Sequence, residues 1–420
     1  MHVLYFHQYF TTPKGSSGTR SYEMAQALLR SGHQVTMVCG SVSGGNTGLD
    51  HAFKRSKRRG VVDGINVIEI ELSYGNHLGI VQRLLVFTKF AFLSIMIALR
   101  EPCDAVFATS TPLTAGIPGI FARWLRRKPF VFEVRDLWPE LPKAMGVISN
   151  PIALWLMSIL EWVSYRSADR LVGLSPGIVR GIKARGVRKD RVAMIPNGCD
   201  LGLFENSDQP WRPSGVRDDQ LLAIFTGTHG QANGLDAVLE AAPLVAAGVG
   251  DGVCIALVGQ GREKARLVKR AKEENIGNVI FLDPVPKTKL TGLMAGADIG
   301  LQILRNVPAF YYGTSPNKFF DYIAAGLPVI NNYPGWLAEL VTNNECGFAV
   351  SPDDPQEFAD ALVAASKDRQ GLQQKGQNAR LLAQESFARS ALSSQWVDWV
   401  EGAYAPKDRS VQLKQAKEIK

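Results

Sequence analysis

The sequence predicts an α/β protein in which two Rossmann-like domains carry parallel sheets that face a central cleft. Three observations support this fold class. The chain has 420 residues, enough for two domains that each bury a core. Short β-rich runs alternate with helical patterns through both halves, which is typical of parallel sheets with crossover helices. A stretch that contains Pro, Gly and Asp at 206–219 separates the two halves and is expected to be a linker.

The strands follow in order from their apolar runs. In the first domain, residues 1–205, we expect strands at 2–10, 34–40, 65–72, 105–110, 130–136, 170–175 and 191–198. In the second domain, residues 220–389, we expect strands at 221–227, 254–261, 278–283, 297–304, 327–332 and 345–350. An amphipathic helix at 390–405 is expected to pack back across the first domain, and the polar tail at 406–420 is expected to fray. Ligands of such sheets bind at the carboxyl ends of the strands, so the site should lie in the cleft.

The positive charge is concentrated in the first domain. Residues 1–200 hold 25 Lys and Arg against 14 Asp and Glu, whereas the remainder holds 22 against 25. Basic clusters stand at 54–59 (KRSKRR) and at 123–128 (RWLRRK). No nucleic-acid-binding motif accompanies them, so we expect no nucleic acid partner. An anionic membrane surface is the partner that we expect for the basic first domain.

Two apolar helices are predicted beside this basic surface, at 84–99 and 152–165. Both fall short of the about 20 uninterrupted apolar residues that a membrane-spanning helix needs. They are either buried core helices or interfacial helices flanked by basic and aromatic residues, and the sequence leaves both interpretations open. We expect a peripheral protein on the inner, cytoplasmic face of the cell membrane.

The chain offers no pattern for a secretory signal, a metal or a disulfide. It begins with a strand-like run, MHVLYFHQYF, that lacks a basic segment and a cleavage site. Its five cysteines are scattered without a C-x-x-C pair, which fits a reducing cytoplasm. The acidic pairs at 218–219 and 353–354 lie in the linker and at a helix start. We therefore expect no cofactor and no metal.

Residues 311–329, YYGTSPNKFFDYIAAGLPV, carry the clearest functional signal. Ser315 is predicted as the N-cap of a short helix that begins at Pro316 and ends before Gly326. The start of a helix attracts phosphate, and Lys318 would add a full positive charge there. Asp321 shares that face and could accept hydrogen bonds from ribose hydroxyls. An ordinary capped helix with a structural role is the alternative.

This segment resembles the donor-binding segment of glycosyltransferase family 4, whose members are retaining enzymes with the two-domain GT-B fold. The ending Gly-Leu-Pro-Val at 326–329 matches the family. Asp321 stands where the family has its second glutamate, the ribose ligand, and Gly313 stands where it has the first. The SPNK string, with Asn317 beside Lys318, resembles the O-antigen and capsule subgroup that includes proposed N-acetyl-L-fucosamine transferases.

Two glycine-containing loops are expected to face the donor phosphates. Residues 15–20, GSSGTR, follow the first strand, and the resemblance assigns Gly18 and Arg20 to the donor side, although a turn that needs glycine for steric reasons is the alternative. Gly227, Thr228 and His229 follow the first strand of the second domain. The family usually places an Arg and a Lys in this region, so the usual phosphate clamp is missing. His229 is either a phosphate contact or a solvent-exposed loop histidine.

The string 133–140, EVRDLWPE, is the candidate catalytic segment. Charges at the end of a buried strand are costly unless they are paired or used. The string resembles the RDLWPE motif of the subgroup, so we assign Asp136 the contact with the donor sugar or the acceptor hydroxyl, supported by Arg135 and Glu140. A structural network of arginine and carboxylate is the alternative. The string 196–200, PNGCD, also resembles the family, but we give it no catalytic role.

The resemblance implies a retaining glycosyltransferase. The expected donor is a nucleotide-sugar, most simply a UDP-linked N-acetylated deoxyhexose. The expected acceptor is an undecaprenyl-diphosphate-linked saccharide used in O-antigen or capsule assembly. Two alternatives remain, a nucleotide-sugar 2-epimerase of the same architecture and a nucleotide-binding scaffold without catalytic activity.

Overall fold

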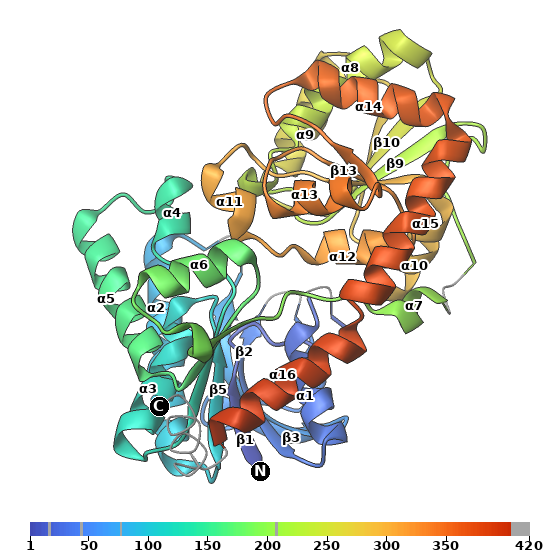
Figure 1. Ribbon diagram of the computed structural model, residues 1–420. Coiled ribbons are helices and arrows are strands. Elements are labelled where there is room, and N and C mark those ends of the chain that lie inside the picture. The colour runs from blue at the N-terminus through green and yellow to red at the C-terminus, as the bar shows by residue number, and fades with distance from the viewer. Residues whose placement is uncertain (16–17, 43–44, 76–77, 206–208, 405–420) are drawn as a thin grey trace, which may run out of the picture.

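The computed structural model describes residues 1–15, 18–42, 45–75, 78–205 and 209–404 and shows two α/β domains (Figure 1). Four predicted features lie partly or wholly outside these residues. They are the middle of the glycine-containing loop at 16–17, the first part of the linker at 206–208, the end of the crossing helix at 405 and the polar tail at 406–420.

The first domain is built on an eight-stranded sheet with the order β3-β4-β2-β1-β5-β6-β7-β8. Its strands are β1 His2–Phe6, β2 Gln34–Val42, β3 Lys57–Val62, β4 Ile65–Tyr74, β5 Ala105–Thr109, β6 Phe130–Val134, β7 Arg170–Gly173 and β8 Val192–Met194. Every neighbouring pair is parallel, as expected, except that β3 and β4 form an antiparallel pair.

Strand β3 was not predicted, because its sequence overlaps the basic cluster at 54–59. The structure pairs part of this cluster with acids. Arg58 binds Glu69 at 2.8 Å, and Arg59 binds Glu101 at 2.6 Å. The cluster at 54–59 is therefore partly neutralised, and less of its charge is available to a partner than the sequence suggested.

Helices cover both faces of this sheet. They are α1 Arg20–Arg30, α2 Ile80–Arg100, α3 Ile117–Leu125, α4 Glu140–Ala144, α5 Pro151–Ser167 and α6 Pro176–Ala184, with short 3-10 helices at Leu113–Gly116 and Lys189–Arg191. Helices α2, α3 and α5 pack side by side, and Phe132 of β6 lies against Tyr165 of α5. Helix α1 packs instead against the C-terminal part of the chain, at α16 Arg389–Tyr404.

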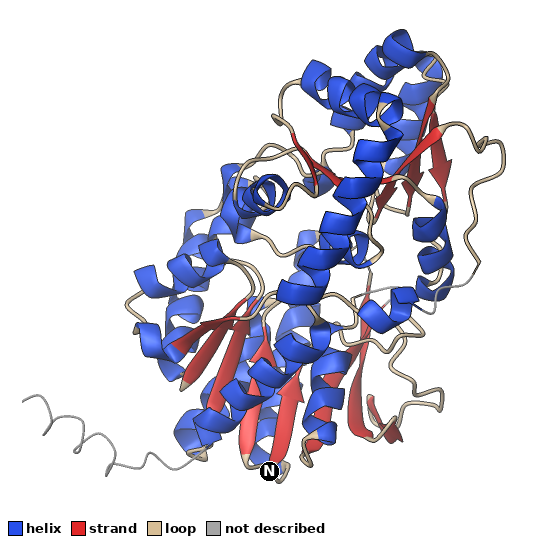
Figure 2. Cartoon of the chain, turned by 45° about the vertical axis from the view of Figure 1, so that its right-hand side comes forward, coloured by secondary structure: helices blue, strands red, loops and turns tan. Residues whose placement is uncertain are grey.

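The final helix, α16 Arg389–Tyr404, packs beside α1 and completes the core of the first domain, as predicted (Figures 1 and 2). Its Trp396 is fully buried, 4.7 Å from Phe107 and 6.1 Å from Tyr5 between ring centroids. Together with α15 Arg369–Ser386, it leads the chain from the second domain down across the first (Figure 2).

The second domain has a six-stranded sheet, all parallel, with the order β11-β10-β9-β12-β13-β14. Its strands are β9 Leu221–Thr226, β10 Val253–Val258, β11 Val279–Leu282, β12 Ile299–Gln302, β13 Val329–Asn331 and β14 Gly347–Ala349. Its helices before α15 are α8 Asp236–Val249, α9 Lys264–Glu273, α10 Lys287–Gly296, α11 Pro308–Gly313, α12 Asn317–Ala324, α13 Trp336–Asn343 and α14 Pro355–Lys367, with a 3-10 helix at Gln231–Asn233.

The chain passes between the domains twice, and the two passages are paired. Cys199 donates its backbone N–H to Phe387 at 2.7 Å, and its carbonyl accepts from the N–H of Arg389 at 2.9 Å. The helix α7 Leu201–Glu205 falls within the range 1–205 that was assigned to the first domain, but its Leu201 and Phe204 pack on the core of the second. The passage therefore lies near residue 199, before the predicted linker.

Helix α2 is longer than the sequence interpretation allowed. Its window 81–100 has a mean hydropathy of 1.6 and is long and apolar enough to cross a membrane by length and composition alone. A core helix passes the same test, but only 28% of this window is buried. Phe90 and Ile97 are buried, whereas Leu85 and Phe92 are exposed. The helix therefore contributes both to the core and to an apolar surface.

Candidate active site

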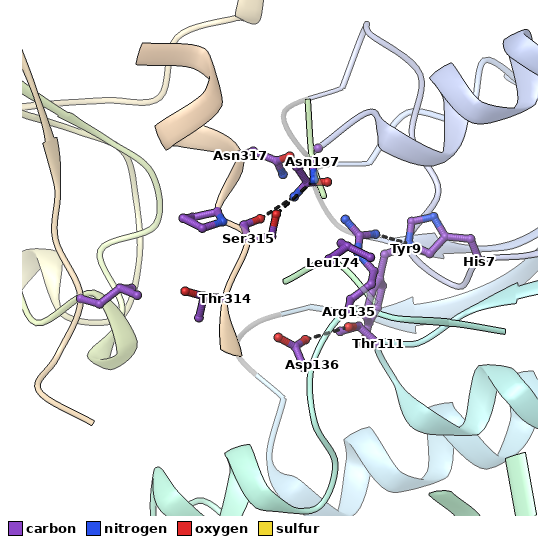
Figure 3. Close-up of a pocket in the computed structure, with 13 residues that line it drawn as sticks. His7, Tyr9, Thr111, Arg135, Asp136, Leu174, Asn197, Thr314, Ser315 and Asn317 are labelled. Carbon is purple, nitrogen blue, oxygen red and sulfur yellow. Dashed lines mark hydrogen bonds between the residues drawn. The ribbon is translucent and has the colours of Figure 1, made fainter. Parts of the chain in front are cut away.

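A cavity of about 350 Å³ opens between the two domains at the carboxyl ends of the first-domain strands (Figure 3). The first domain contributes residues from the loops after β1, β5, β6 and β7 and from the interdomain passage, namely His7, Tyr9, Gly18, Thr111, Arg135, Asp136, Leu174 and Asn197. The second domain contributes the segment that leads into α12, namely Thr314, Ser315, Pro316 and Asn317, together with Leu304.

Five of the residues predicted for the site line this cavity: Gly18, Arg135, Asp136, Ser315 and Asn317. The sequence interpretation did not select His7, Tyr9, Thr111 or Asn197. The first three follow the carboxyl ends of β1 and β5, where the strand-end rule for ligand sites could have found them.

Asp136 is held at the cavity by Thr111. The Thr111 hydroxyl donates to Asp136 Oδ2 at 3.1 Å, and Thr111 has φ of +89°. A β-branched residue rarely adopts a positive φ, and such strain is common at functional sites. Burial raises the pKa of Asp136, while the hydrogen bond from Thr111 and the charge of Arg135 act in the opposite direction. The carboxylate is therefore positioned to accept a hydrogen bond from a sugar hydroxyl.

Arg135 brings a positive charge to the same wall. Its Nη1 lies 3.4 Å from His7 Nε2, and burial followed by the charge of Arg135 holds the pKa of His7 well below its usual value. His7 is therefore neutral near pH 7 and accepts through Nε2. Within the described chain, no carboxylate lies within 4.0 Å of the Arg135 guanidinium. This charge is available to an anionic ligand.

Arg20 does not line the cavity, so the structure does not support its predicted role in donor binding. Its guanidinium donates to Glu133 at 2.9 and 3.0 Å and to the carbonyls of Ile195 and Pro196 at 2.9 and 2.6 Å. Both charged side chains are fully buried, and Thr109 donates a further hydrogen bond to Glu133 at 2.9 Å. The structural network is thus present, but its arginine is Arg20 and not Arg135.

Glu140 also lies away from the site. It is exposed in the first turn of α4 and does not line the cavity, so the structure does not place it as a support for Asp136.

A second cationic group lies beside the cavity, at the start of α12. Lys318 Nζ donates to Asn233 Oδ1 at 2.7 Å and sits 4.1 Å from the centroid of the Phe225 ring. Asn233 in turn donates to the carbonyl of Thr228 at 2.6 Å. Burial alone lowers the pKa of Lys318 to about 7, and within the described residues no carboxylate lies within 4.0 Å of its ammonium. Lys318 next to Gly227 and Thr228 forms a cationic corner at the carboxyl end of β9.

His229 belongs to this corner and is fully buried, so the alternative of a solvent-exposed loop histidine is wrong. Its ring lies near Phe225 and Phe281, with centroids 6.1 and 6.3 Å away. Burial, with the charges of Lys264 and Lys318, lowers its pKa to about 4. Neither ring nitrogen has a hydrogen-bond partner within the part of the chain that the structure describes. A neutral imidazole with unused hydrogen-bonding capacity thus lies behind the lysine.

Two glycines allow the loops after β9 and β10 to approach closely. A Cβ on Gly259, which has φ of +152°, would lie 1.8 Å from the carbonyl oxygen of Gly227. A Cβ on Gly261 would lie 2.3 Å from the carbonyl oxygen of His229. Because glycine has no Cβ, the two loops can pack this closely, and their close packing fixes the loop that carries Thr228 and His229.

Ser315 is not the N-cap that the sequence predicted. Helix α12 begins at Asn317, with Pro316 before it, and no side chain caps it. Ser315 instead joins the domains, because its hydroxyl accepts from the N–H of Asn197 at 3.1 Å and its carbonyl accepts from Asn197 Nδ2 at 2.5 Å. The PNGCD string, which was given no role, therefore supplies an interdomain contact across the cavity (Figure 3).

The remaining predicted residues lie on either side of this contact. A Cβ on Gly18 would approach Asn317 Nδ2 to 2.7 Å, so glycine permits the close approach of the two domains here. Asp321 does not line the cavity and pairs with Lys287 at 3.4 Å. A ribose that binds Asp321 would have to share its carboxylate with that lysine.

Within the described ranges, no group of three or more His, Cys, Asp or Glu side chains could hold a metal ion. The metal independence expected from the sequence stays a prediction.

Comparison with known proteins agrees with the fold and the cleft. Residues 15–198 match the glycosyl transferase 4-like domain, and residues 220–368 match the glycosyl transferases group 1 domain. The two matches fall on the two domains of the structure. Together they support a glycosyltransferase of the GT-B type.

The chain is similar to the D-inositol 3-phosphate glycosyltransferase of Thermomonospora curvata, with 29% identity over 47% of this chain and 48% of the relative. It is also similar to the putative colanic acid biosynthesis glycosyl transferase WcaI of Escherichia coli, with 23% identity over 59% of this chain and 60% of the relative. The chain thus spans about half of these curated relatives. The structure of HepE from Anabaena in complex with UDP-glucose has the same fold, with a TM-score of 0.66, 18% identity and coverage of 96% of this chain and 100% of HepE.

Proposed function

We propose that the protein transfers a sugar, with retention of configuration and without a metal ion, from a nucleotide-sugar to a lipid-linked saccharide. The donor proposed from the subgroup resemblance is a UDP-linked N-acetylated deoxyhexose. The acceptor is an undecaprenyl-diphosphate-linked saccharide at the cytoplasmic face of the membrane. The product would enter a surface polysaccharide such as O-antigen or capsule.

The observation that carries this proposal is the pair of cations at the cleft that lack an acidic partner within the described chain. Arg135 lines the cavity from the first domain, and Lys318 stands at the start of α12 in the second. A nucleoside diphosphate-sugar carries its negative charge between the nucleoside and the sugar. One cation from each domain, together with a helix N-terminus, suits such a diphosphate and the diphosphate that departs in the reaction.

The other cavity residues suit the sugars. Asp136 can accept hydrogen bonds from hydroxyls of the donor sugar or of the acceptor, while Thr111 holds its carboxylate in place. Asn317 lies across the cavity and adds an amide for the donor. The structural neighbour HepE was solved in complex with UDP-glucose, which supports the donor class. The similar protein WcaI is named for colanic acid biosynthesis, which supports the product class.

The test combines the protein, membranes that contain lipid-linked saccharides, and a panel of UDP-sugars. Release of UDP and formation of a lipid-linked product are measured for the native chain and for Lys318→Met and Asp136→Asn. Lys269→Met, an exposed lysine on α9, is the matched control. We expect a lipid-linked product with one UDP-sugar. Product formation should be lost in both site variants and unchanged in the control.

Two results would replace the proposal. An isomerised UDP-sugar formed without any acceptor would indicate the epimerase. UDP binding without UDP release from any member of the panel would indicate the scaffold.

A further inference from the structure

The first domain holds a second cavity, of about 540 Å³, at the opposite end of the sheet from the cleft. Strand β7 connects the two places, because Arg170 at its start lines this cavity and Leu174 just after its end lines the cleft. The walls come from α3, α5, the loop before β8 and α16. We call it the arginine cavity after Arg123, Arg166, Arg170, Arg188 and Arg191.

The arginine cavity has more positive charge than its acids can neutralise. Its two carboxylates are engaged, since Asp169 binds Arg123 at 3.0 Å and Asp190 binds Arg188. The other three arginines have no carboxylate within 4.0 Å in the described chain. Arg170 donates to the carbonyl of Trp399 at 3.1 Å and stacks on its ring.

The remaining two arginines are also held by neutral groups. Arg166 lies over the Trp162 ring at 5.5 Å, and Arg191 donates to the carbonyls of Ala168 and Asp169. Planar guanidinium groups bind phosphate oxygens in pairs, so an anionic phosphate is the ligand class that this cavity suits.

The surface beside the cavity indicates that this phosphate belongs to a lipid. Trp124 lines the cavity and is 67% exposed, with its indole N–H donated to Ser167 at 2.9 Å. Further large apolar side chains are exposed along the adjoining helices α2, α3 and α5, namely Leu85, Phe92, Leu125, Ile152, Trp155 and Trp162. We call this surface the apolar face. Tryptophans next to arginines are typical of protein surfaces at the boundary between lipid and water.

We propose that the apolar face lies on a bilayer and that the arginine cavity binds the phosphate head group of an anionic phospholipid. The proposal rests on the proposed function in one respect, namely that the acceptor is lipid-linked. Strand β7 has four residues, so the head-group site and the cleft are separated by roughly 15 Å along it. A protein docked in this way holds its cleft close to the membrane surface. The saccharide part of a lipid-linked acceptor lies at that surface.

The test uses the full chain and co-sedimentation with vesicles of phosphatidylcholine, with and without phosphatidylglycerol. The variant Arg166→Gln/Arg188→Gln removes two exposed arginines of the cavity. The control variant Arg217→Gln/Lys269→Gln removes two exposed cations outside the first domain, each of which pairs with a carboxylate. Each arginine near an anionic surface contributes about fivefold to binding, so we expect roughly 25-fold weaker binding of the cavity variant to anionic vesicles. The control variant should change by less than about twofold.

Two further measurements identify the source of the phosphate and the role of the apolar face. Trp155→Ser/Trp162→Ser should reduce binding to both kinds of vesicle, since it removes apolar contact. Inorganic phosphate is titrated into the native chain and the cavity variant by calorimetry. Binding of inorganic phosphate that depends on the arginines, together with vesicle binding that does not, would overturn the proposal. Equal losses in the cavity variant and the control would overturn it as well, because only net charge would then matter.

A transfer assay with a water-soluble, short-chain acceptor separates this inference from the proposed function. The cavity variant should keep its rate with that acceptor and lose it with acceptor in anionic vesicles. A chain that docks as described yet transfers no sugar would contradict the proposed function and leave the docking surface intact.

Discussion

Replacing Lys318 with methionine tests the charge at the start of α12. Methionine keeps an unbranched apolar stem against Phe225 and removes the ammonium. In the free protein burial lowers the pKa of Lys318 to about 7, so at pH 8 only about a tenth of the molecules carry the charge there. A bound diphosphate favours the ammonium and raises this pKa again.

The sign of the pH dependence follows from these two states. UDP binds best to the protonated lysine, so its affinity should be highest below pH 7 and fall by up to about tenfold per pH unit above it. At pH 8 the complex should take up close to one proton per UDP. Removal of a hydrogen bond to a charged group costs about 1.5–3 kcal/mol, so Lys318→Met should weaken UDP binding about 10- to 100-fold near pH 7.

Isothermal titration calorimetry in buffers of different ionisation enthalpy measures both the affinity and the proton uptake. Lys269→Met on α9 is the control and should behave as the native chain. Because the folded protein disfavours the charged lysine, Lys318→Met should be as stable as the native chain or more stable at pH 7. Equal UDP affinity in the variant, or an affinity of the native chain that does not change from pH 7 to 9, would refute this account of the donor site.

Three further predictions concern the framework of the site. Glu133→Gln leaves the Arg20 charge buried without compensation, so urea unfolding should show that the free energy of unfolding falls by about 3–5 kcal/mol. A fall of less than about 1 kcal/mol would contradict the buried network. Gly259→Ala forces its Cβ against the carbonyl of Gly227, so both the affinity for UDP and the melting temperature should fall. An unchanged melting temperature would contradict the close contact between the two loops. Asn197→Ala removes the interdomain hydrogen bond from its side-chain amide to the carbonyl of Ser315, so small-angle scattering should show a more open protein with unchanged thermal stability of each domain. An unchanged radius of gyration would contradict the link.

The sheets could be predicted because strands buried on both faces leave long apolar runs in the sequence. β10 Val253–Val258, for example, has no polar residue apart from a cysteine and is buried throughout. β3 could not be found in the same way. Its charges are accommodated by Glu69 and Glu101 from other elements, and these pairs form only in the folded chain.

The site was predictable where chemistry is local and not where it depends on distant partners. The cost of burying charges at the end of a strand correctly indicated that Glu133 and Arg135 need either partners or a functional role. It could not tell which arginine would bind Glu133, because Arg20 lies 113 residues earlier in the chain. The link between Asn197 and Ser315 depends on how the two domains are oriented, and no local pattern encodes that.

The position of Trp396 has a consequence for how the chain is made. The core around Tyr5 and Phe107 stays open until α16 arrives, and α16 is the last helix that the structure describes. During synthesis on a ribosome the first domain to emerge is therefore the last to be completed, while the second domain can already close its own core. A chain halted before residue 389 would present an unfinished hydrophobic face to chaperones, so a stop codon just before α16 should be as damaging as one much earlier in the coding sequence.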